Sequence, residues 1–166
     1  MKQRIYSLLV DNTAGVLSRI SGLFSRRGYN IDSLTVGVTA DPRYSRMTIA
    51  SSGDDLTLEQ IGKQLEKLVD VRDVKILKPK KSVNRELILV KIKCEKEDRQ
   101  NIITLANIYR GRVVDTGHHS MIIELTGENS KLEAFLTMLD GYEILELART
   151  GLTGLSRGID DVTYLE

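Results

Sequence analysis

The sequence predicts an α+β protein in which two units of the same kind follow one another. Segments rich in Val, Ile and Leu alternate with segments whose apolar residues recur at helical spacing. The resulting order, strand–helix–strand–strand–helix–strand, occurs twice. A charged segment that contains a proline, residues 78–82, separates the two halves. With 166 residues, the chain is long enough for one domain or two small ones.

The first half begins with an apolar strand, Ile5–Val10, followed by an amphipathic helix, Gly15–Arg27, that ends at Gly28. The apolar positions of this helix are Val16, Leu17, Ile20, Leu23 and Phe24. Two strands, a helix and a final strand follow at Ile31–Thr39, Ser45–Ser52, Leu58–Leu68 and Val71–Leu77. The pattern Thr57-Leu58-Glu59-Gln60 predicts a capping box at the start of the second helix.

The second half repeats this order. Its strand, helix, two strands, helix and strand are expected at Arg85–Cys94, Lys96–Tyr109, Arg112–Thr116, Ser120–Leu125, Lys131–Asp140 and Ile144–Arg149. Gly111 and Gly141 stand where helix ends favour a left-handed residue, and Ser130-Lys131-Leu132-Glu133 predicts another capping box. Helices placed around a central hairpin predict two ferredoxin-like βαββαβ sandwiches, each with both helices on one face of an antiparallel sheet.

We expect residues 1–78 to form the first domain, residues 79–82 a solvated linker, and residues 83–166 the second domain with a tail. A sheet face that carries Tyr6, Leu8 and Val10 would expose too much apolar surface in a monomer. We therefore expect another subunit or the second domain to cover this face or the strand edges. Gly151–Gly158 superficially resembles a phosphate loop, but it lacks the Gly-Lys-Ser/Thr ending and is interpreted as a flexible or partner-docked tail.

Composition narrows the possible functions. The formal net charge is +1, which predicts no general attraction to nucleic acid or to anionic membranes. The first apolar run ends at Asp11, too short for a signal peptide, and no segment is long enough to span a bilayer. Cys94 is the only cysteine and fits a strand thiol in a reducing compartment. These features predict a soluble, cytoplasmic protein.

Residues suited to catalysis or metal binding are scarce. His118 and His119 are the only histidines, and they are expected in the turn of a hairpin. Adjacent side chains of an extended segment point in opposite directions, so one metal ion would not readily bind both. Ser120 beside His119 lacks a nucleophile elbow or an oxyanion hole. The sequence therefore predicts no catalytic residue and no metal ligand.

The junction between the first strand and the first helix is the best candidate for a ligand site. Amide groups in the first turn of a helix lack intrahelical partners and lie at the positive end of the helix dipole, so they can bind a carboxylate. Gly15 would allow the ligand to approach the backbone. The segment Tyr29–Ile31 is expected to bring the Asn30 amide to the same end of the sheet. Turn formation and helix capping are the alternative explanation for these residues.

Several segments resemble a known protein family. They are Ile5–Asn12, Gly15–Arg19, Gly22–Ile31, Ser33–Val36, Ser45–Ile49, Gln60–Val74, Ile108–Gly111, Ala148–Gly151 and Gly154–Gly158. In this order they resemble the regulatory small subunit of acetohydroxyacid synthase (acetolactate synthase), whose N-terminal part is an ACT domain. The Arg-Gly-Tyr-Asn-Ile and Leu-Ser-Arg-Gly sequences are specific to that family. The resemblance covers nearly the whole chain.

The resemblance implies a non-catalytic subunit that activates a large catalytic subunit and confers feedback inhibition by a branched-chain amino acid, usually valine. The large subunit would hold thiamine diphosphate, magnesium and FAD, and this chain would hold no cofactor. The reaction of the large subunit would begin the synthesis of valine, leucine and isoleucine. The resemblance also implies a homodimer formed through the N-terminal ACT domains and an ACT-like C-terminal domain.

Matched position by position, the family's effector site falls on residues from two chains. They are Asn12, Gly15, Val16 and Leu17 of one chain and Asn30 and Ile31 of the neighbouring chain.

Two other functions remain possible on sequence alone. One is an ACT-domain regulator that binds an amino acid but serves a different metabolic enzyme, which need not have this second half. The other is an acylphosphatase-type enzyme, although its glycine-rich phosphate-binding signature is absent here.

Overall fold

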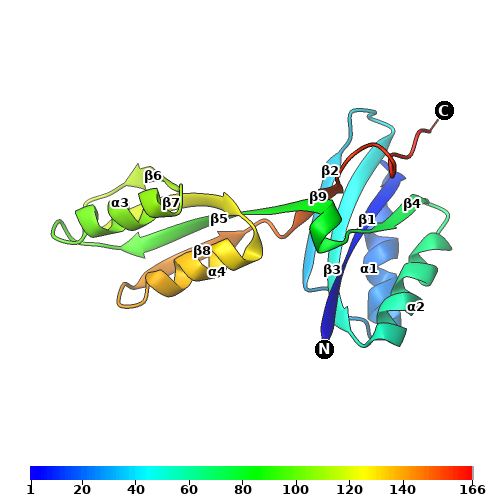
Figure 1. The fold of residues 1–166 in the computed structure, drawn as a ribbon, viewed down its shortest axis with the longest axis horizontal. Coiled ribbons are helices and arrows are strands. Elements are labelled where there is room, and N and C mark those ends of the chain that lie inside the picture. Colours follow the sequence, from blue (N-terminus) through cyan, green and yellow to red (C-terminus); the bar gives the residue numbers. More distant parts are fainter. Residues whose placement is uncertain (166) are drawn as a thin grey trace. The chain divides into compact units, whose positions relative to one another are not determined.

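The computed structural model describes residues 1–165 and divides into two compact units (Figure 1). The first unit contains Met1–Asn84 together with the tail from Leu152 onward, and the second contains Arg85–Gly151. Each unit has an antiparallel sheet and two helices, which confirms the predicted α+β fold with two ferredoxin-like sandwiches. The tail lies with the first unit, whereas the sequence had suggested that it belongs to the second.

The first unit has the predicted order of elements. They are β1 (Lys2–Asp11), α1 (Val16–Arg27), β2 (Ser33–Val38), β3 (Tyr44–Gly53), α2 (Asp55–Glu66) and β4 (Val71–Ile76). The strands lie in the order β2-β3-β1-β4, so β2 and β4 form the edges of the sheet. In Figure 1, α1 and α2 lie on the same side of this sheet.

The face of the first sheet that carries Tyr6, Leu8 and Val10 packs against the helices. These three side chains are almost completely buried, together with Ile20, Phe24, Leu58, Ile61 and Leu65 of the helices. The Tyr6 hydroxyl also donates a hydrogen bond to the Leu58 carbonyl. The expectation that another subunit or the second domain would be needed to cover this face was therefore wrong, because β1 turns its apolar residues toward α1 and α2 and its alternate residues toward the other face.

The other face of the first sheet is covered by the chain's own tail. Strand β9 (Thr153–Ser156) pairs with β5 (Ser82–Lys93), and the Arg157 amide donates to the Lys81 carbonyl at 2.7 Å. The Leu152 amide donates to Ser33 Oγ at 2.7 Å, and Thr35 Oγ1 donates to the Leu152 carbonyl at 2.8 Å. The tail, which the sequence predicts to be flexible or docked on a partner, is instead bonded to this unit of its own chain, and its residues 153–156 form a short, paired strand.

The second unit is a similar sandwich. Its elements are the greater part of β5, followed by α3 (Arg99–Ile108), β6 (Arg112–Thr116), β7 (Ser120–Gly127), α4 (Asn129–Met138) and β8 (Ile144–Arg149). The strand order is β6-β7-β5-β8, and the inward side chains of β5 and β7 pack against Ile102 and Phe135 of the helices. The expected solvated linker contains a short 3₁₀-helix, Pro79–Lys81, and Ser82 already belongs to β5.

The helix ends differ from the predicted capping patterns. Asp54 caps α2, because its carboxylate accepts from the Thr57 amide at 2.7 Å, so Thr57 is a donor and not the capping residue. Ser130 lies inside α4. Gly28 and Gly141 have the expected left-handed backbone, with φ of 67° and 93°. After α3 the prediction of a left-handed Gly111 was wrong, since Arg110 takes that conformation (φ 59°). A Cβ at Gly111 would lie 3.1 Å from the Glu124 carbonyl oxygen.

Replacement of Gly154 tests the attachment of the tail. A Cβ at this position would lie 2.0 Å from Asn84 Oδ1 and 2.9 Å from Leu77 Cδ1, so Gly154→Ala should loosen β9. We expect hydrogen exchange at residues 152–157 to accelerate about tenfold, which corresponds to about 1.4 kcal/mol of local stability. Gly37→Ala is the matched control, because nothing lies within 4 Å of its Cβ position. Unchanged exchange in the tail of Gly154→Ala would contradict this account of its docking.

Candidate functional site

The junction between β1 and α1 has the free backbone amides that the sequence predicts. Gly15 is the N-cap of α1, and no side chain of residues 1–165 forms a capping hydrogen bond there. Asn12, Thr13 and Ala14 are exposed in the turn that leads to it. The first-turn amides of α1 are therefore available to an anion.

The conformation of Gly15 explains the glycine at this position. Its φ of 86° lies in the left-handed region, where a side chain is strained, and a Cβ would lie 2.8 Å from Arg19 Nη1. The next two residues have different surroundings, since Val16 is buried in the core and Leu17 is 48% exposed. Leu17 thus presents an apolar side chain beside the free amides.

Asn12 is held by the turn between β2 and β3. Its backbone amide donates to the Arg43 carbonyl at 2.8 Å, and its Nδ2 donates to the Pro42 carbonyl at 3.0 Å. This side-chain bond uses an amide hydrogen, so the Asn12 side-chain oxygen can still accept from a ligand. The sequence singled out Asn12 but did not predict the turn that positions it.

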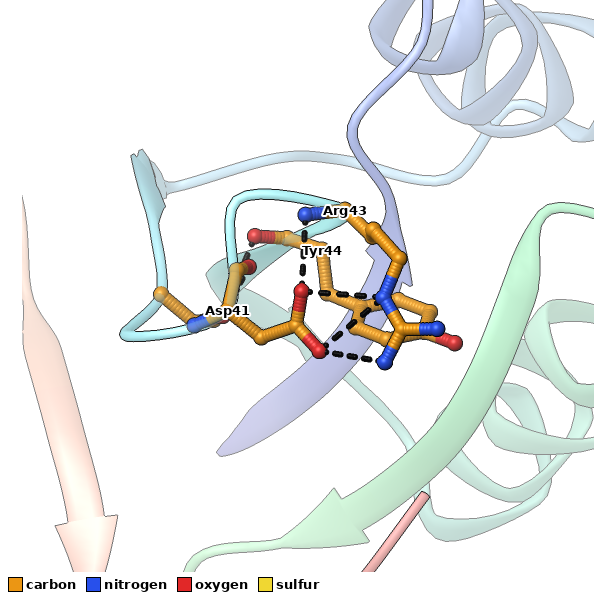
Figure 2. Close-up of polar contacts among 4 residues, drawn as sticks. Asp41, Arg43 and Tyr44 are labelled. Carbon is orange, nitrogen blue, oxygen red and sulfur yellow. Dashed lines mark hydrogen bonds and ion pairs between the residues drawn. The ribbon is translucent and has the colours of Figure 1, made fainter. Parts of the chain in front are cut away.

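Figure 2 shows how this turn is stabilised. The Arg43 guanidinium forms an ion pair with the Asp41 carboxylate, with Nη2 2.6 Å from Oδ2, and lies over the Tyr44 ring at 5.2 Å from its centroid. The Arg43 backbone amide donates to the same carboxylate at 3.0 Å. Hydrogen bonds from the Arg43 side chain and backbone hold the pKa of Asp41 below its usual value. The turn that holds Asn12 is thus stabilised by its own side chains.

Two ion pairs lie beside the junction. Arg19 of α1 pairs with Asp70, and Arg72 of β4 binds Asp11 through two bonds of 2.8 and 3.0 Å. The hydrogen bond from Arg19 lowers the pKa of Asp70 and outweighs the opposing effect of desolvation. The Asp11 amide also donates to the Asp70 carbonyl at 2.9 Å. These contacts fix the end of β1 relative to the first turn of α1.

Asn30 and Ile31 lie at the opposite end of the same sheet. The Asn30 carbonyl accepts a hydrogen bond from the Ser51 hydroxyl. The residue after Ile31, Asp32, donates its amide to the carbonyl of Ala50, which pairs with Ile5 near the start of β1. Asn12 follows the far end of that strand, about 23 Å away at about 3.3 Å per residue. The prediction that Asn30 reaches the same end of the sheet within one chain was therefore wrong, because α1 runs back along the full length of β1.

The Asn30 side chain takes part in a polar cluster at that end. Its Nδ2 donates to the Asp32 carboxylate, which also accepts from Ser52 and Gln3. Desolvation raises the pKa of Asp32, but these three hydrogen bonds together lower it below its usual value. Ile31 is half-buried and packs against the core of the first unit.

The histidines lie in the β6–β7 hairpin region, as the sequence predicts. His119 pairs with Glu95 at 2.9 Å, and both side chains are more than half exposed. Cys94 is buried at the end of β5, and this burial raises the pKa of its thiol.

Residues 1–165 contain no group of three or more His, Cys, Asp or Glu that could hold a metal ion. None of the helices described for these residues is long and apolar enough to cross a membrane.

Comparison with known proteins identifies the family. Residues 6–73 match the model of the acetohydroxyacid synthase (AHAS) small subunit-like ACT domain, and residues 85–158 match the model of the small subunit of acetolactate synthase. The chain belongs to the acetolactate synthase small-subunit family. Both units are covered, including the second half that an ACT regulator of another enzyme need not contain.

Several relatives resemble this family member over nearly their full length. A probable acetolactate synthase small subunit of Methanothermobacter thermautotrophicus is 50% identical over 93% of this chain and 92% of the relative. The acetolactate synthase isozyme 3 small subunit of Salmonella typhimurium is 49% identical over 94% of this chain and 96% of the relative. The crystal structure of the small subunit from Thermotoga maritima has a TM-score of 0.88 and 42% identity, and covers 95% of this chain and 99% of that one.

The Arg19–Asp70 pair makes a prediction about pH. The lowered pKa of Asp70 means that its carboxylate stabilises the folded state above the ordinary Asp pKa of about 4, and that this contribution disappears as the pH falls below it. Asp70→Asn should therefore lower the melting temperature at pH 7, with the difference from wild type shrinking toward pH 3. Thermal unfolding followed by circular dichroism measures this. Asp55→Asn is the control, because Asp55 pairs with Lys2 and both side chains are 70% exposed. An equal loss of melting temperature in the two variants would contradict the role of Asp70.

Proposed function

We propose that this small-subunit family member activates the catalytic large subunit of acetolactate synthase and confers feedback inhibition by a branched-chain amino acid, valine in the first instance. The observation that carries the proposal is the uncapped start of α1 at Gly15. Its free amides provide a carboxylate site in the domain that matches the family's ACT model.

The residues around Gly15 suit a free amino acid. The amides of Val16 and Leu17 would bind the carboxylate, and the side-chain oxygen of Asn12 would accept a hydrogen bond from the ammonium group. The half-exposed Leu17 side chain would contact the apolar side chain of the effector. The binding free energies of valine, leucine and isoleucine in such a pocket differ by only about 1–3 kcal/mol. We therefore expect all three to bind, with valine as the main effector.

The other part of the proposed site would come from a second copy of the chain. Strand β2 is an edge strand that runs parallel to β1, and Val36 and Val38 on it are 50% and 63% exposed. Antiparallel pairing of two β2 edges would place the start of one β2 beside the end of the other. Asn30 and Ile31 of the neighbouring chain would then approach the Gly15 junction, which they do not reach within one chain.

The proposed partner carries out the chemistry. In this proposal the large subunit holds thiamine diphosphate, magnesium and FAD and joins the fragment left by decarboxylation of pyruvate to a second 2-oxo acid. This chain contributes no catalytic group and no cofactor. A regulator of a different enzyme would keep the same effector site, but the family match over residues 85–158 favours acetolactate synthase as the target.

Reconstitution tests the activating role. The purified chain alone should form no acetolactate from pyruvate, and adding it to its cognate large subunit should increase the rate of acetolactate formation. Both rates are measured colorimetrically under the same conditions. Pyruvate consumption by the pure chain, or a large subunit that is indifferent to it, would refute the proposal.

Gly15→Asp tests the effector site. The new carboxylate would oppose that of valine, and each 1.4 kcal/mol of lost binding weakens affinity about tenfold. Asp is among the residues that tolerate a left-handed backbone, and Arg19 lies beside it, so we expect folding and activation to survive. Inhibition by valine should disappear, whereas Asn30→Ala should weaken it more mildly.

The controls for this experiment separate folding from binding. Circular dichroism and activation of the large subunit report on the fold and on the partner interaction, and calorimetry reports on valine binding. Ser21→Ala, an exposed position on α1 that is remote from the junction, should leave inhibition unchanged. An unaltered inhibition curve for Gly15→Asp would show that the effector binds elsewhere.

A further inference from the structure

Cavities that are separate from the Gly15 junction lie between the tail and the outer face of the first sheet, which is the face opposite to α1 and α2. Three cavities, of about 370, 290 and 210 Å³, lie along this face, and Arg46 lines all of them. The smallest has a floor of sheet residues and a roof of tail residues: Ser7, Arg46, Lys75 and Leu77 below, and Leu155, Ser156, Gly158, Val162 and Thr163 above. All of these residues belong to the first unit.

The floor of the smallest cavity is positively charged. Arg46 is half-buried and donates from Nη1 to Ser7 Oγ at 2.8 Å, and among residues 1–165 it forms no ion pair. Lys75 pairs across the sheet with Ser7, so the two cations flank the same hydroxyl, and the Lys75 side chain is only 19% exposed. No acidic residue lines this cavity.

Two carboxylates on this face, Asp73 and Asp41, are already engaged. Asp73 lies 3.6 Å from Lys75 Nζ and also accepts a hydrogen bond of 2.7 Å from Thr163 Oγ1 in the tail. Asp41 lines the neighbouring 290 Å³ cavity, but Arg43 binds it. A partly buried guanidinium without a carboxylate partner is costly, and its planar donors match an oxyanion.

Hydroxyl groups add further polar character to this face. Ser156 and Thr163 line the roof of the cavity, and Ser7 lies in its floor. Thr48 sits beside Ser7 in the sheet, is 1% exposed, and its Oγ1 has no hydrogen-bond partner among residues 1–165. The sheet under the tail therefore carries one buried hydroxyl, that of Thr48, which the described residues leave without a hydrogen-bond partner.

We infer that the Arg46–Lys75 cavity is a binding site for a small oxyanion, either a carboxylate or a phosphate, that bridges the first sheet and the tail. The cavity volume of about 210 Å³ is ample for a small oxyanion, since a single water molecule requires only about 10–15 Å³. The site is distinct from the Gly15 junction, because its residues lie on the sheet face opposite to the helices. An occupant would contact both the sheet and the tail, so its binding would favour the docked tail.

The test uses the full chain with inorganic phosphate and acetate as separate probes, against chloride at constant ionic strength. Calorimetry should detect a saturable site that depends on Arg46, and hydrogen exchange at residues 155–163 should slow when this site fills. Arg46→Gln should weaken binding about tenfold or more, because a charge-assisted hydrogen bond is lost. Arg26→Gln removes the same charge from an exposed position on α1 and should bind as wild type does.

The two probes separate the possible ligands. Tighter binding of phosphate would assign the site to phosphates, and tighter binding of acetate to carboxylates. If circular dichroism shows that Arg46→Gln is unfolded, Arg46→Lys and Lys75→Gln replace it, and both should weaken binding. Equal affinity in wild type and these variants, or no saturable binding of either probe to wild type, would overturn the inference.

Discussion

The whole first unit depends on one geometric constraint, which is that both helices lie on one side of a four-stranded sheet. The opposite face must then be covered, and the tail covers it through hydrogen bonds to Ser33 and Thr35 and a close approach at Gly154. Polar residues of this face, such as Ser7 and Thr48, are consequently as buried as the core. In the second unit, Leu89 on the corresponding side of β5 is 39% exposed in the structure of residues 1–165.

Because the tail belongs to the first unit, that unit is formed by two separate stretches of the sequence. Because the chain leaves the first unit after Asn84 and returns to it at Leu152, the second unit is an insertion into the first. The outgoing strand β5 and the returning strand β9 are paired, and Arg157 bonds to Lys81 just before β5 begins. The segments where the chain leaves the first unit and returns to it are thus linked by a hydrogen bond within that unit.

The sequence predicts the elements well and their surroundings less well. Alternating and helical patterns reflect local burial, so every strand from β1 to β8 and the four α-helices of residues 1–165 were predicted. Strand β9 was missed because four residues that include Gly154 carry little local preference, and only pairing with a distant segment makes them a strand. Periodicity alone also could not show which face of β1 meets the helices, nor that Asp54 rather than Thr57 caps α2.

The candidate site shows the same division between local and distant information. The Gly15 junction follows from neighbouring residues and was predicted, whereas the separation of Asn30 from it depends on the direction of α1 across the sheet. Since the two parts lie about 23 Å apart in one chain, the proposed effector can contact both only when two chains associate. Binding of such a ligand and association of the chains must then strengthen one another by the same free energy. In the proposed complex, the effector would thus regulate the catalytic partner by favouring one arrangement of the paired ACT domains.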